Sequence, residues 1–321
     1  MRVLFVSSGN SVYGISPITK GQGDSLIKRG IDLEYFLIRG KGVSGYLKSI
    51  APLRKRLKEH RYDIVHAHYG LCGVIAGLAR RREKLVVSFM GDDLIGEKDD
   101  KGNNTFIGNL YVSIDKWFAR HRFNTCIVKS DEMAGILKKA GVEPFVLPNG
   151  VDFSIFFPVE MNKAREELGL DPDQKIVLFV SRTSRPEKNF ALAGEAVDLL
   201  KDSNVRLIDV YGIPQEKLNL YYSAADTLIL TSFHEGSPNA VKEAMACNCP
   251  IVATPVGDVK KVTGRTEGCF ITSYDAGETA DKIRKALEFG KRTTGRSDIA
   301  HLDSRKTAER LEDIYRKTIE Q

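Results

Sequence analysis

The chain has 321 residues, of which 42% are hydrophobic and 28% charged, and a formal net charge of +6. These values are typical of a soluble globular protein, and the length suggests two domains. The longest apolar run, 71–79, is far shorter than the ~20 residues of a membrane-spanning helix, and the N-terminal apolar run is too short for a signal peptide. Five cysteines at no metal-like spacing indicate reduced thiols in a cytoplasmic protein.

Positive charge is concentrated in the first half of the chain. Residues 1–150 hold 24 lysines and arginines against 15 acidic residues, whereas residues 151–321 hold 24 against 27. The cations cluster on the predicted helix 46–60 and at 80–82, which favours contact with an anionic membrane or a nucleic acid. Aromatic residues are not interleaved with these cations, so single-stranded nucleic acid is disfavoured. A solvated helix face is the alternative interpretation.

Short apolar runs alternate with helical patterns in the first half of the chain. Strands are expected at 3–7, 32–38, 63–68, 84–89, 124–129 and 145–147. Helices are expected at 16–29, 46–60, 71–79, 112–121 and 131–140. Residues 94–110 are rich in Gly, Asp and Asn and are expected to form a mobile surface loop. The loop 8–14 lacks a G-x-G-x-x-G pattern, so it does not predict a dinucleotide site.

The second half repeats this alternation after the turn residues 148–150, which mark a domain boundary. Strands are expected at 175–180, 205–211, 226–230, 251–253 and 268–271, and helices at 162–168, 190–200, 218–224, 238–247, 277–290 and 303–320. Alternation throughout predicts an α/β protein with two doubly wound parallel sheets. Ligands then bind at the carboxyl ends of the strands, in the crevice between the two domains.

The most informative stretch runs from 230 to 254 and places two carboxylates around a helix start. Ser237 suits the N-cap and Pro238 the first helical position, which leaves Glu235 free to face a cleft. Glu243 lies on the same helix face as Asn239. The helix N-terminus suits a phosphate, and the two carboxylates suit the hydroxyls of a sugar and a ribose. The residues alone leave a second interpretation open, in which both are solvated surface acids.

Two histidines mark the end of the third strand. His66 and His68 alternate with Ala67 and therefore share one face of the strand, where metal binding or acid–base chemistry is conceivable. No third ligand stands at a recognisable spacing, which favours a position near a substrate over a metal site.

With these motifs in place, nearly the whole chain resembles the retaining glycosyltransferases of the GT-B fold, in their fourth sequence family. Glu235 and Glu243 match the family's E-x7-E motif. The resemblance implies that Glu235 holds hydroxyls of the donor sugar and Glu243 the ribose of the nucleotide. It also implies that residues 236–239, namely Gly236, Ser237, Pro238 and Asn239, contact the sugar and diphosphate, and that Gly14 approaches the phosphates.

Arg182 and Lys188 match the family's R-x5-K pair. Two cations on one loop fit a diphosphate leaving group and take the place of the metal that other transferases use. The resemblance thus implies catalysis by Glu235, Arg182 and Lys188 without a metal or other cofactor. One departure is Met90, which stands where the family often has a histidine; Asp92 or Asp93 are candidates to compensate.

The expected function follows from this resemblance. The expected reaction transfers a sugar, with retention of configuration, to a sugar or lipid-linked acceptor in cell-surface polysaccharide or glycolipid synthesis. A UDP-sugar is the expected donor, because uridine is the commonest base in the family. His66, His68 and Asp92 are the acceptor-side candidates. The expected domains are 1–150 and 151–305, with a C-terminal helix, 306–321, that returns to the first domain. The expected location is cytoplasmic, with peripheral contact to the inner face of the membrane and no nucleic-acid partner. A catalytically weak nucleotide-sugar-binding protein and a sugar-nucleotide epimerase are the alternatives.

Overall fold

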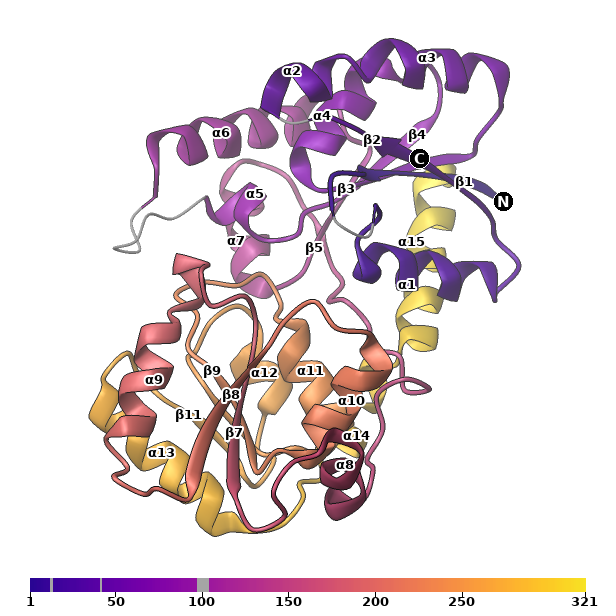
Figure 1. Ribbon diagram of the computed structural model, residues 1–321. Helices are drawn as coiled ribbons and strands as arrows, with labels where there is room; N and C mark the ends of the chain where they lie inside the picture. Colours follow the sequence, from indigo (N-terminus) through magenta and orange to yellow (C-terminus); the bar gives the residue numbers. More distant parts are fainter. Residues whose placement is uncertain (12–13, 41, 97–103) are drawn as a thin grey trace. The chain divides into compact units, whose positions relative to one another are not determined.

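The structure is a computed structural model that describes residues 1–11, 14–40, 42–96 and 104–321. Among these residues, unit 1 comprises the chain up to Gly150 together with Ser304–Gln321, and unit 2 comprises Val151–Asp303. Both units consist of a parallel sheet with helices on its two faces (Figure 1). The chain therefore has the two Rossmann-like domains that the alternating pattern predicts.

Unit 1 contains a parallel sheet with the strand order β2-β1-β3-β4-β5-β6 in the part of the chain that is described. The strands are β1 (Arg2–Ser8), β2 (Asp32–Ile38), β3 (Ile64–His68), β4 (Lys84–Ser88), β5 (Thr125–Val128) and β6 (Phe145–Val146). β1 and β3 are almost completely buried, as expected for parallel strands covered on both faces.

The helices of unit 1 form two layers. They are α1 (Pro17–Ile27), α2 (Gly42–Leu47), α3 (Ile50–Glu59), α4 (Gly70–Ala79), α5 (Asp92–Ile95), α6 (Phe106–His121), α7 (Asp131–Lys139) and α15 (Ser304–Glu320). One core joins α3, α4, α6 and α7 to one sheet face. A second core joins α1 and α15 to the other face, so the C-terminal helix completes unit 1. Figure 1 shows α15, in yellow, beside α1.

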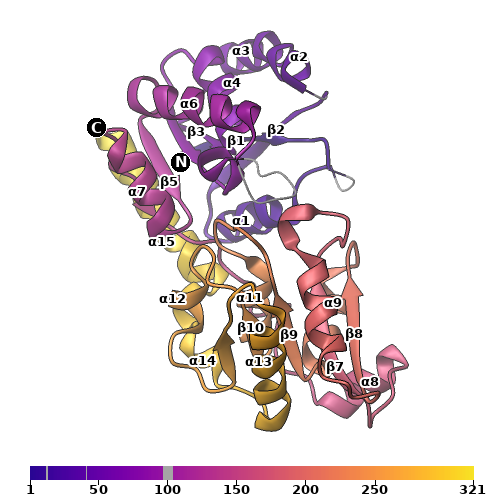
Figure 2. The same cartoon turned by 90° about the vertical axis from the view of Figure 1, so that its left-hand side faces the viewer.

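Unit 2 contains a parallel sheet with the strand order β11-β10-β9-β7-β8 in its described residues. The strands are β7 (Lys175–Val180), β8 (Val205–Val210), β9 (Thr227–Leu230), β10 (Ile251–Ala253) and β11 (Cys269–Ile271). Helices α9 (Phe190–Asp198) and α13 (Ala276–Phe289) lie together on one face, as Figure 2 shows. The other face carries α10 (Gln215–Ala224), α11 (Asn239–Ala246), α12 (Val259–Thr263) and α14 (Gly295–Asp298). Helix α8 (Met161–Leu168) packs against α10, and η1 (Pro186–Lys188) and η2 (Ala300–Leu302) are short 3-10 turns.

The single helix predicted at 46–60 is wrong, because the structure has two helices there, α2 and α3. The reason is Pro52. In a helix running from 46 to 60, Pro52 would be an interior residue that lacks its N–H and clashes with the preceding turn. A helix that begins at Ile50 places Pro52 in the first turn, where a backbone N–H has no intrahelical acceptor to lose.

The predicted loop at 94–110 is wrong at both of its ends. α5 covers residues up to Ile95, and α6 begins at Phe106, six residues before the predicted start. The Thr105 hydroxyl accepts a hydrogen bond from the backbone N–H of Gly108 at 3.0 Å and so caps α6. Residues 97–103 of the predicted loop lie outside the described part of the chain.

Candidate functional site

The carboxyl edge of the unit 2 sheet brings together the cation and the carboxylate that the sequence singles out. Lys188, at the end of η1, forms an ion pair with Glu235, in the loop after β9. Each side chain is 16% exposed. The Ser232 hydroxyl also donates to Oε1 of Glu235, at 2.9 Å. The pair is thus shielded enough for its charges to interact strongly, yet it remains open to a ligand.

Hydrogen bonds fix the two loops that carry this pair to one another. The Thr231 hydroxyl donates to the carbonyl oxygens of Lys188 and Asn189, at 3.0 and 2.8 Å. The backbone N–H of Phe233 donates to the carbonyl oxygen of Glu187 at 2.9 Å. Because these contacts are backbone-anchored, the position of Lys188 relative to Glu235 is set by the fold, which is what a preorganised charge site needs.

The second cation of the motif, Arg182, is held by an aromatic ring. Its guanidinium lies over the ring of Tyr211, 4.7 Å from the centroid, and donates to the Tyr211 hydroxyl at 3.2 Å. Tyr211 follows β8, so it stands at the same carboxyl edge of the sheet. Stacking restricts an otherwise flexible, exposed arginine to the neighbourhood of that edge.

Ser237 does not cap α11, and this prediction is wrong. The helix begins at Asn239 with Pro238 at the N-cap position. Ser237 Oγ instead donates to Asp258 Oδ2 at 2.6 Å and accepts from Lys242 Nζ at 2.7 Å. Lys242 is buried, and an amine buried there requires such partners. The chain from 237 to 242 is therefore tied to Asp258 by long-range contacts that override the local capping preference.

The backbone at Gly257 lies in close contact with the loop that contains Glu235. Gly257 has a φ of +54°, and a Cβ there would lie 2.7 Å from the carbonyl oxygens of Glu235 and Gly236. Only glycine fits this position. The turn at Gly257 therefore supports the loop that presents Glu235.

The second carboxylate, Glu243, lies just over one turn inside α11, because the helix begins at Asn239. It accepts a hydrogen bond from the hydroxyl of Tyr222, at 2.8 Å. Burial raises the pKa of Glu243 to about 6, while the Tyr222 hydroxyl and Lys242 oppose this rise. The carboxylate is thus held in one orientation with a second oxygen left to accept from a ligand hydroxyl.

The two histidines of β3, His66 and His68, face the protein interior. His66 is fully buried; its Nδ1 lies 2.5 Å from the Tyr315 hydroxyl and its Nε2 lies 2.8 Å from Ser88 Oγ. His68 is 4% exposed. Burial, with smaller effects of the nearby Lys129, lowers the pKa of His68 to about 3 and that of His66 well below its usual value. Both rings are therefore neutral, and both nitrogens of His66 are occupied by protein groups.

The loop after β4 contains the remaining unit 1 candidates. Asp92 is exposed at the start of α5, whereas Asp93 accepts the backbone N–H groups of Gly70, Met90 and Gly91. Asp93 thus shapes the backbone at Met90, and Asp92 is left at the surface. Gly14 has a φ of +73°, and its N–H donates to the carbonyl oxygen of Ser11 at 2.9 Å.

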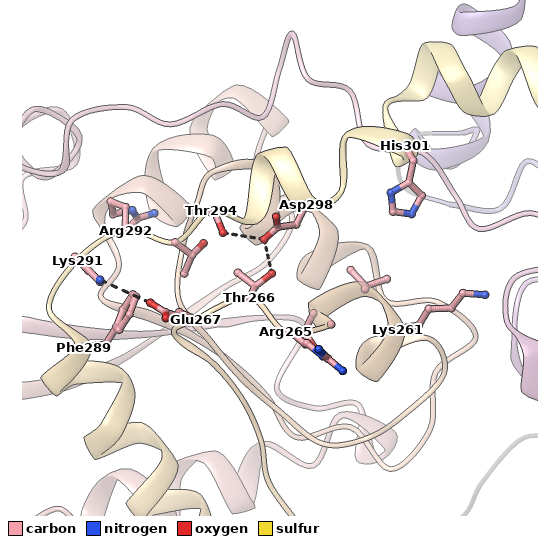
Figure 3. A pocket seen from close by; sticks show the side chains of 14 residues that line it. Lys261, Arg265, Thr266, Glu267, Phe289, Lys291, Arg292, Thr294, Asp298 and His301 are labelled. Atoms are coloured by element: carbon pink, nitrogen blue, oxygen red, sulfur yellow. Dashed lines mark hydrogen bonds and ion pairs between the residues drawn. The ribbon is translucent and has the colours of Figure 1, made fainter.

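A separate cavity of about 420 Å³ lies at the opposite, amino edge of the unit 2 sheet (Figure 3). It is formed by the segment that precedes β11 and by the connection from α13 to α14. Its side chains largely satisfy one another: Thr266 and Thr294 both donate to Asp298 (Figure 3), and Arg292 donates to three backbone carbonyls. Among the described residues, no group of His, Cys, Asp and Glu is arranged to hold a metal ion.

Three residues of the site escape sequence analysis. Tyr211 holds Arg182, Tyr222 holds Glu243, and Lys242 holds Ser237. Tyr211 had a usable signal, since it is an aromatic residue directly after an apolar strand. Tyr222 and Lys242 had none, because each reads as an ordinary residue of a helix.

Comparisons with known proteins agree with this architecture. Residues 6–155 match the family described as Glycosyltransferase Family 4, and residues 208–288 match Glycosyl transferases group 1. The putative teichuronic acid biosynthesis glycosyltransferase TuaC of Bacillus subtilis is 31% identical over 304 residues, which is 80% of this chain and 74% of the relative. The D-inositol 3-phosphate glycosyltransferase of Mycolicibacterium smegmatis is 28% identical over 276 residues; the alignment spans 75% of this chain and 63% of that protein.

Solved structures share the fold. A sucrose-phosphate synthase from Thermosynechococcus elongatus has a TM-score of 0.84 at 18% identity, covering 99% of this chain and 98% of its own. HepE of Anabaena, in complex with UDP-glucose, has a TM-score of 0.77 at 18% identity, covering 99% and 100%. The fold and the sequence together define a GT-B protein. This chain belongs to the group 1 glycosyltransferases, as the E-x7-E and R-x5-K motifs predict.

Proposed function

We propose that this chain transfers a sugar from a nucleotide diphosphate sugar to an acceptor hydroxyl, with retention of anomeric configuration. The observation that carries the proposal is the ion pair between Lys188 and Glu235, with Arg182 on the same loop as Lys188. Two cations at the carboxyl edge of a parallel sheet suit a diphosphate, and an adjacent carboxylate suits sugar hydroxyls.

In the proposed complex, the diphosphate draws Lys188 and Arg182 to its oxygens. Lys188 then exchanges part of its contact with Glu235 for the phosphate, and this frees Glu235 to accept hydrogen bonds from the donor sugar. Glu243, oriented by Tyr222, accepts from the ribose hydroxyls. The N–H groups at the start of α11 and the polar stretch at 236–239 lie beside this carboxylate pair and complete the donor site.

The proposed reaction breaks the bond between the anomeric carbon and the leaving phosphate oxygen. The acceptor oxygen forms its bond on the same face of the sugar, and its proton passes to the leaving phosphate. Negative charge grows on that phosphate as the bond breaks, so Arg182 and Lys188 stabilise the transition state more than the bound donor. These cations fill the role of a metal, and the proposal requires none.

The donor and acceptor classes are part of the proposal. UDP-glucose is bound in HepE of Anabaena, and this supports a UDP-sugar. TuaC is named for teichuronic acid biosynthesis, and this supports a cell-surface polysaccharide or lipid-linked acceptor for the chain. Transfer to a lipid-linked acceptor would place the protein at the inner face of the membrane, so the proposed location is cytoplasmic and peripheral.

A panel of UDP-, GDP- and ADP-sugars tests the proposal by thermal shift, and the stabilising donor is then assayed for hydrolysis and transfer. A donor at 100 times its Kd raises the free energy of unfolding by about 2.7 kcal/mol. Transfer that persists in EDTA, with an unchanged anomeric configuration by NMR, is the expected result. Binding without turnover on any acceptor would instead favour a nucleotide-sugar-binding protein, and interconversion of the sugar without an acceptor would favour an epimerase.

A further inference from the structure

Helix α6 of unit 1 presents an apolar face to solvent. Its large exposed side chains are Phe106, Ile107, Leu110, Tyr111, Ile114 and Trp117. Phe106 is 85% exposed and Trp117 is 54% exposed. These residues follow helical spacing and lie side by side along the helix, so they form one continuous stripe and not scattered positions. We call this stripe the outer face of α6.

The fold itself does not use the outer face. The opposite side of the helix supplies the buried residues Gly108, Val112, Asp115 and Ala119, which meet the core of unit 1. Figure 1 shows α6 at the margin of unit 1. A helix that is apolar on its outer side as well as its inner side marks an interaction surface, because exposed apolar stripes of this size are uncommon on a soluble protein.

Charge around the outer face is positive. The one acidic residue of α6, Asp115, is buried on the inner side. Arg120 and Arg122 are exposed at the C-terminal end of the helix. The Arg80 guanidinium donates to the carbonyl oxygen of Arg122, which brings the exposed residues 81 and 82, both arginines, to the same end. Burial, and then the nearby charge of Arg122, lowers the pKa of Arg80, while the carboxylate of Glu83 opposes this effect, so the cations at this end outnumber one nearby acid.

We propose that the outer face of α6 docks on a lipid bilayer with acidic headgroups, with the apolar side chains among the acyl-chain boundary and the arginines on the headgroups. An apolar stripe with aromatic residues and flanking cations is the pattern of helices that lie in the membrane interface. No helix in the described residues is long and apolar enough to cross a membrane, so α6 would lie in the interface plane.

Charge selects the bilayer over a second copy of the chain. Two copies meeting through α6 would bring apolar stripes together but would leave the exposed arginines facing a second α6 helix, whose one acidic residue, Asp115, is buried. An acidic bilayer accommodates both features, because its acyl-chain boundary buries the apolar stripe and its headgroups attract the cations.

The basic helix that the sequence analysis singled out, now α3, is a poorer candidate for this contact than the outer face of α6. On α3, Arg56 forms an ion pair with Glu34 and contacts the Tyr62 hydroxyl, and Arg54 donates to the carbonyl oxygen of Leu78. These arginines serve the fold. α3 also has no exposed large apolar residue, so it offers no group to insert.

The chain carries a built-in reporter, because Trp117 is its one tryptophan. Titrating the full chain with vesicles of phosphatidylglycerol should shift Trp117 emission to the blue, and brominated acyl chains should quench it. Vesicles of phosphatidylcholine should have a much weaker effect, and added salt should weaken the shift. The readout needs no donor or turnover, so its failure is distinct from failure of the proposed sugar transfer.

Matched variants locate the contact. Leu110→Glu should weaken partitioning to phosphatidylglycerol vesicles by at least about tenfold. Ile27→Glu, at a similarly exposed apolar residue of α1 in the same unit, should leave it unchanged. Arg120→Glu with Arg122→Glu should weaken it by at least about fivefold for each cation removed. Lys55→Glu with Lys58→Glu, on α3, should have a markedly smaller effect.

Circular dichroism of every variant checks that weaker vesicle binding does not come from loss of folding. Three outcomes would overturn the proposal. The first is no spectral shift with acidic vesicles, and the second is an equal shift with neutral ones. The third is burial of Trp117 that depends on protein concentration without lipid, together with a dimer in sedimentation velocity, since that result would assign the face to a second copy.

Discussion

Two strand ends that look alike in the sequence have opposite roles in the fold. β3 ends in His66 and His68, and β9 is followed by the polar loop that contains Glu235. In unit 1, Phe5 and Tyr315 cover the histidines, and the Phe5 ring lies 4.4 Å from that of His68. In unit 2, the ion pair of Glu235 and Lys188 is less enclosed, because each side chain remains 16% exposed. A polar residue at a strand end therefore predicts a ligand site only where no other element packs over it.

The largest expected effect comes from removing the charge of Lys188 at the carboxyl edge of unit 2. Lys188→Ala should lower kcat for sugar transfer by roughly 100- to 1,000-fold, because a preorganised charge at the leaving group is lost. Steady-state kinetics with the donor found by thermal shift measures the effect. Lys285→Ala, an exposed lysine of α13, is the control and should keep normal kcat. An unchanged kcat in the Lys188 variant would remove this lysine from the mechanism.

A buried acid of unit 1 allows a test through pH. Burial, and then the charge of Asp93, raises the pKa of Asp115 to about 8. In the unfolded chain this carboxyl ionises near pH 3.9. Between these values the native state holds the extra proton, so stability falls as pH rises through this window.

Asp115→Asn should remove this loss. We expect the variant to be more stable than the wild type at pH 8 by about 5 kcal/mol, with the difference vanishing near pH 4. Urea unfolding at several pH values measures it, with the exposed Asp313→Asn as control. A difference that is constant from pH 4 to pH 8 would contradict the raised pKa.

The buried side of the comparison is tested by two Tyr→Phe changes in unit 1. Tyr315→Phe should destabilise the protein by about 1–3 kcal/mol, because Nδ1 of His66 is left buried without its partner. Tyr35→Phe should be neutral or stabilising, since the Tyr35 hydroxyl is buried without a hydrogen bond among the described residues. Equal costs for both changes in urea unfolding would show that the His66 contact has no special weight.

The smallest effect concerns the aromatic support of Arg182. Tyr211→Ala should raise the KM for the donor by about two- to fivefold, because an exposed cation–π contact is worth ~0.5–1 kcal/mol. Tyr211→Phe keeps the ring and should retain most of the affinity. If Tyr211→Phe were as impaired as Tyr211→Ala, the hydroxyl and not the ring would be the important contact.

Much of the fold can be predicted because parallel strands buried on both faces give continuous apolar runs. β7, at Lys175–Val180, begins and ends at its predicted residues for this reason. The helix at 46–60 was predicted wrongly although the sequence contained the decisive residue, Pro52. The early start of α6 was missed because Gly, Asp and Asn before it outweighed the cap at Thr105.

The roles predicted for the site residues stay a prediction, and the contacts that hold these residues in place could not be predicted from the sequence. Lys188 belongs to the R-x5-K motif and Glu235 to the E-x7-E motif, and both motifs can be read from the sequence because their spacing is local. The structure places these two residues in an ion pair. Ser237 was assigned to a cap because capping rules use only neighbouring residues. Its actual partner, Asp258, is 21 residues away and becomes a neighbour only through the fold.

The position of α15 has a consequence for how the chain is made. Ala308, Leu311, Ile314 and Tyr315 of this helix fill the core of unit 1 against strands formed from residues 1–128. A ribosome delivers these residues only after all of unit 2. Unit 1 thus waits, with one sheet face covered by α1 but not yet by α15, until residues 304–321 emerge, whereas unit 2 can fold as soon as its own residues emerge. A fragment ending at Gly150 would leave the α15 side of that face exposed, so separating the two halves for study requires grafting 304–321 onto the first.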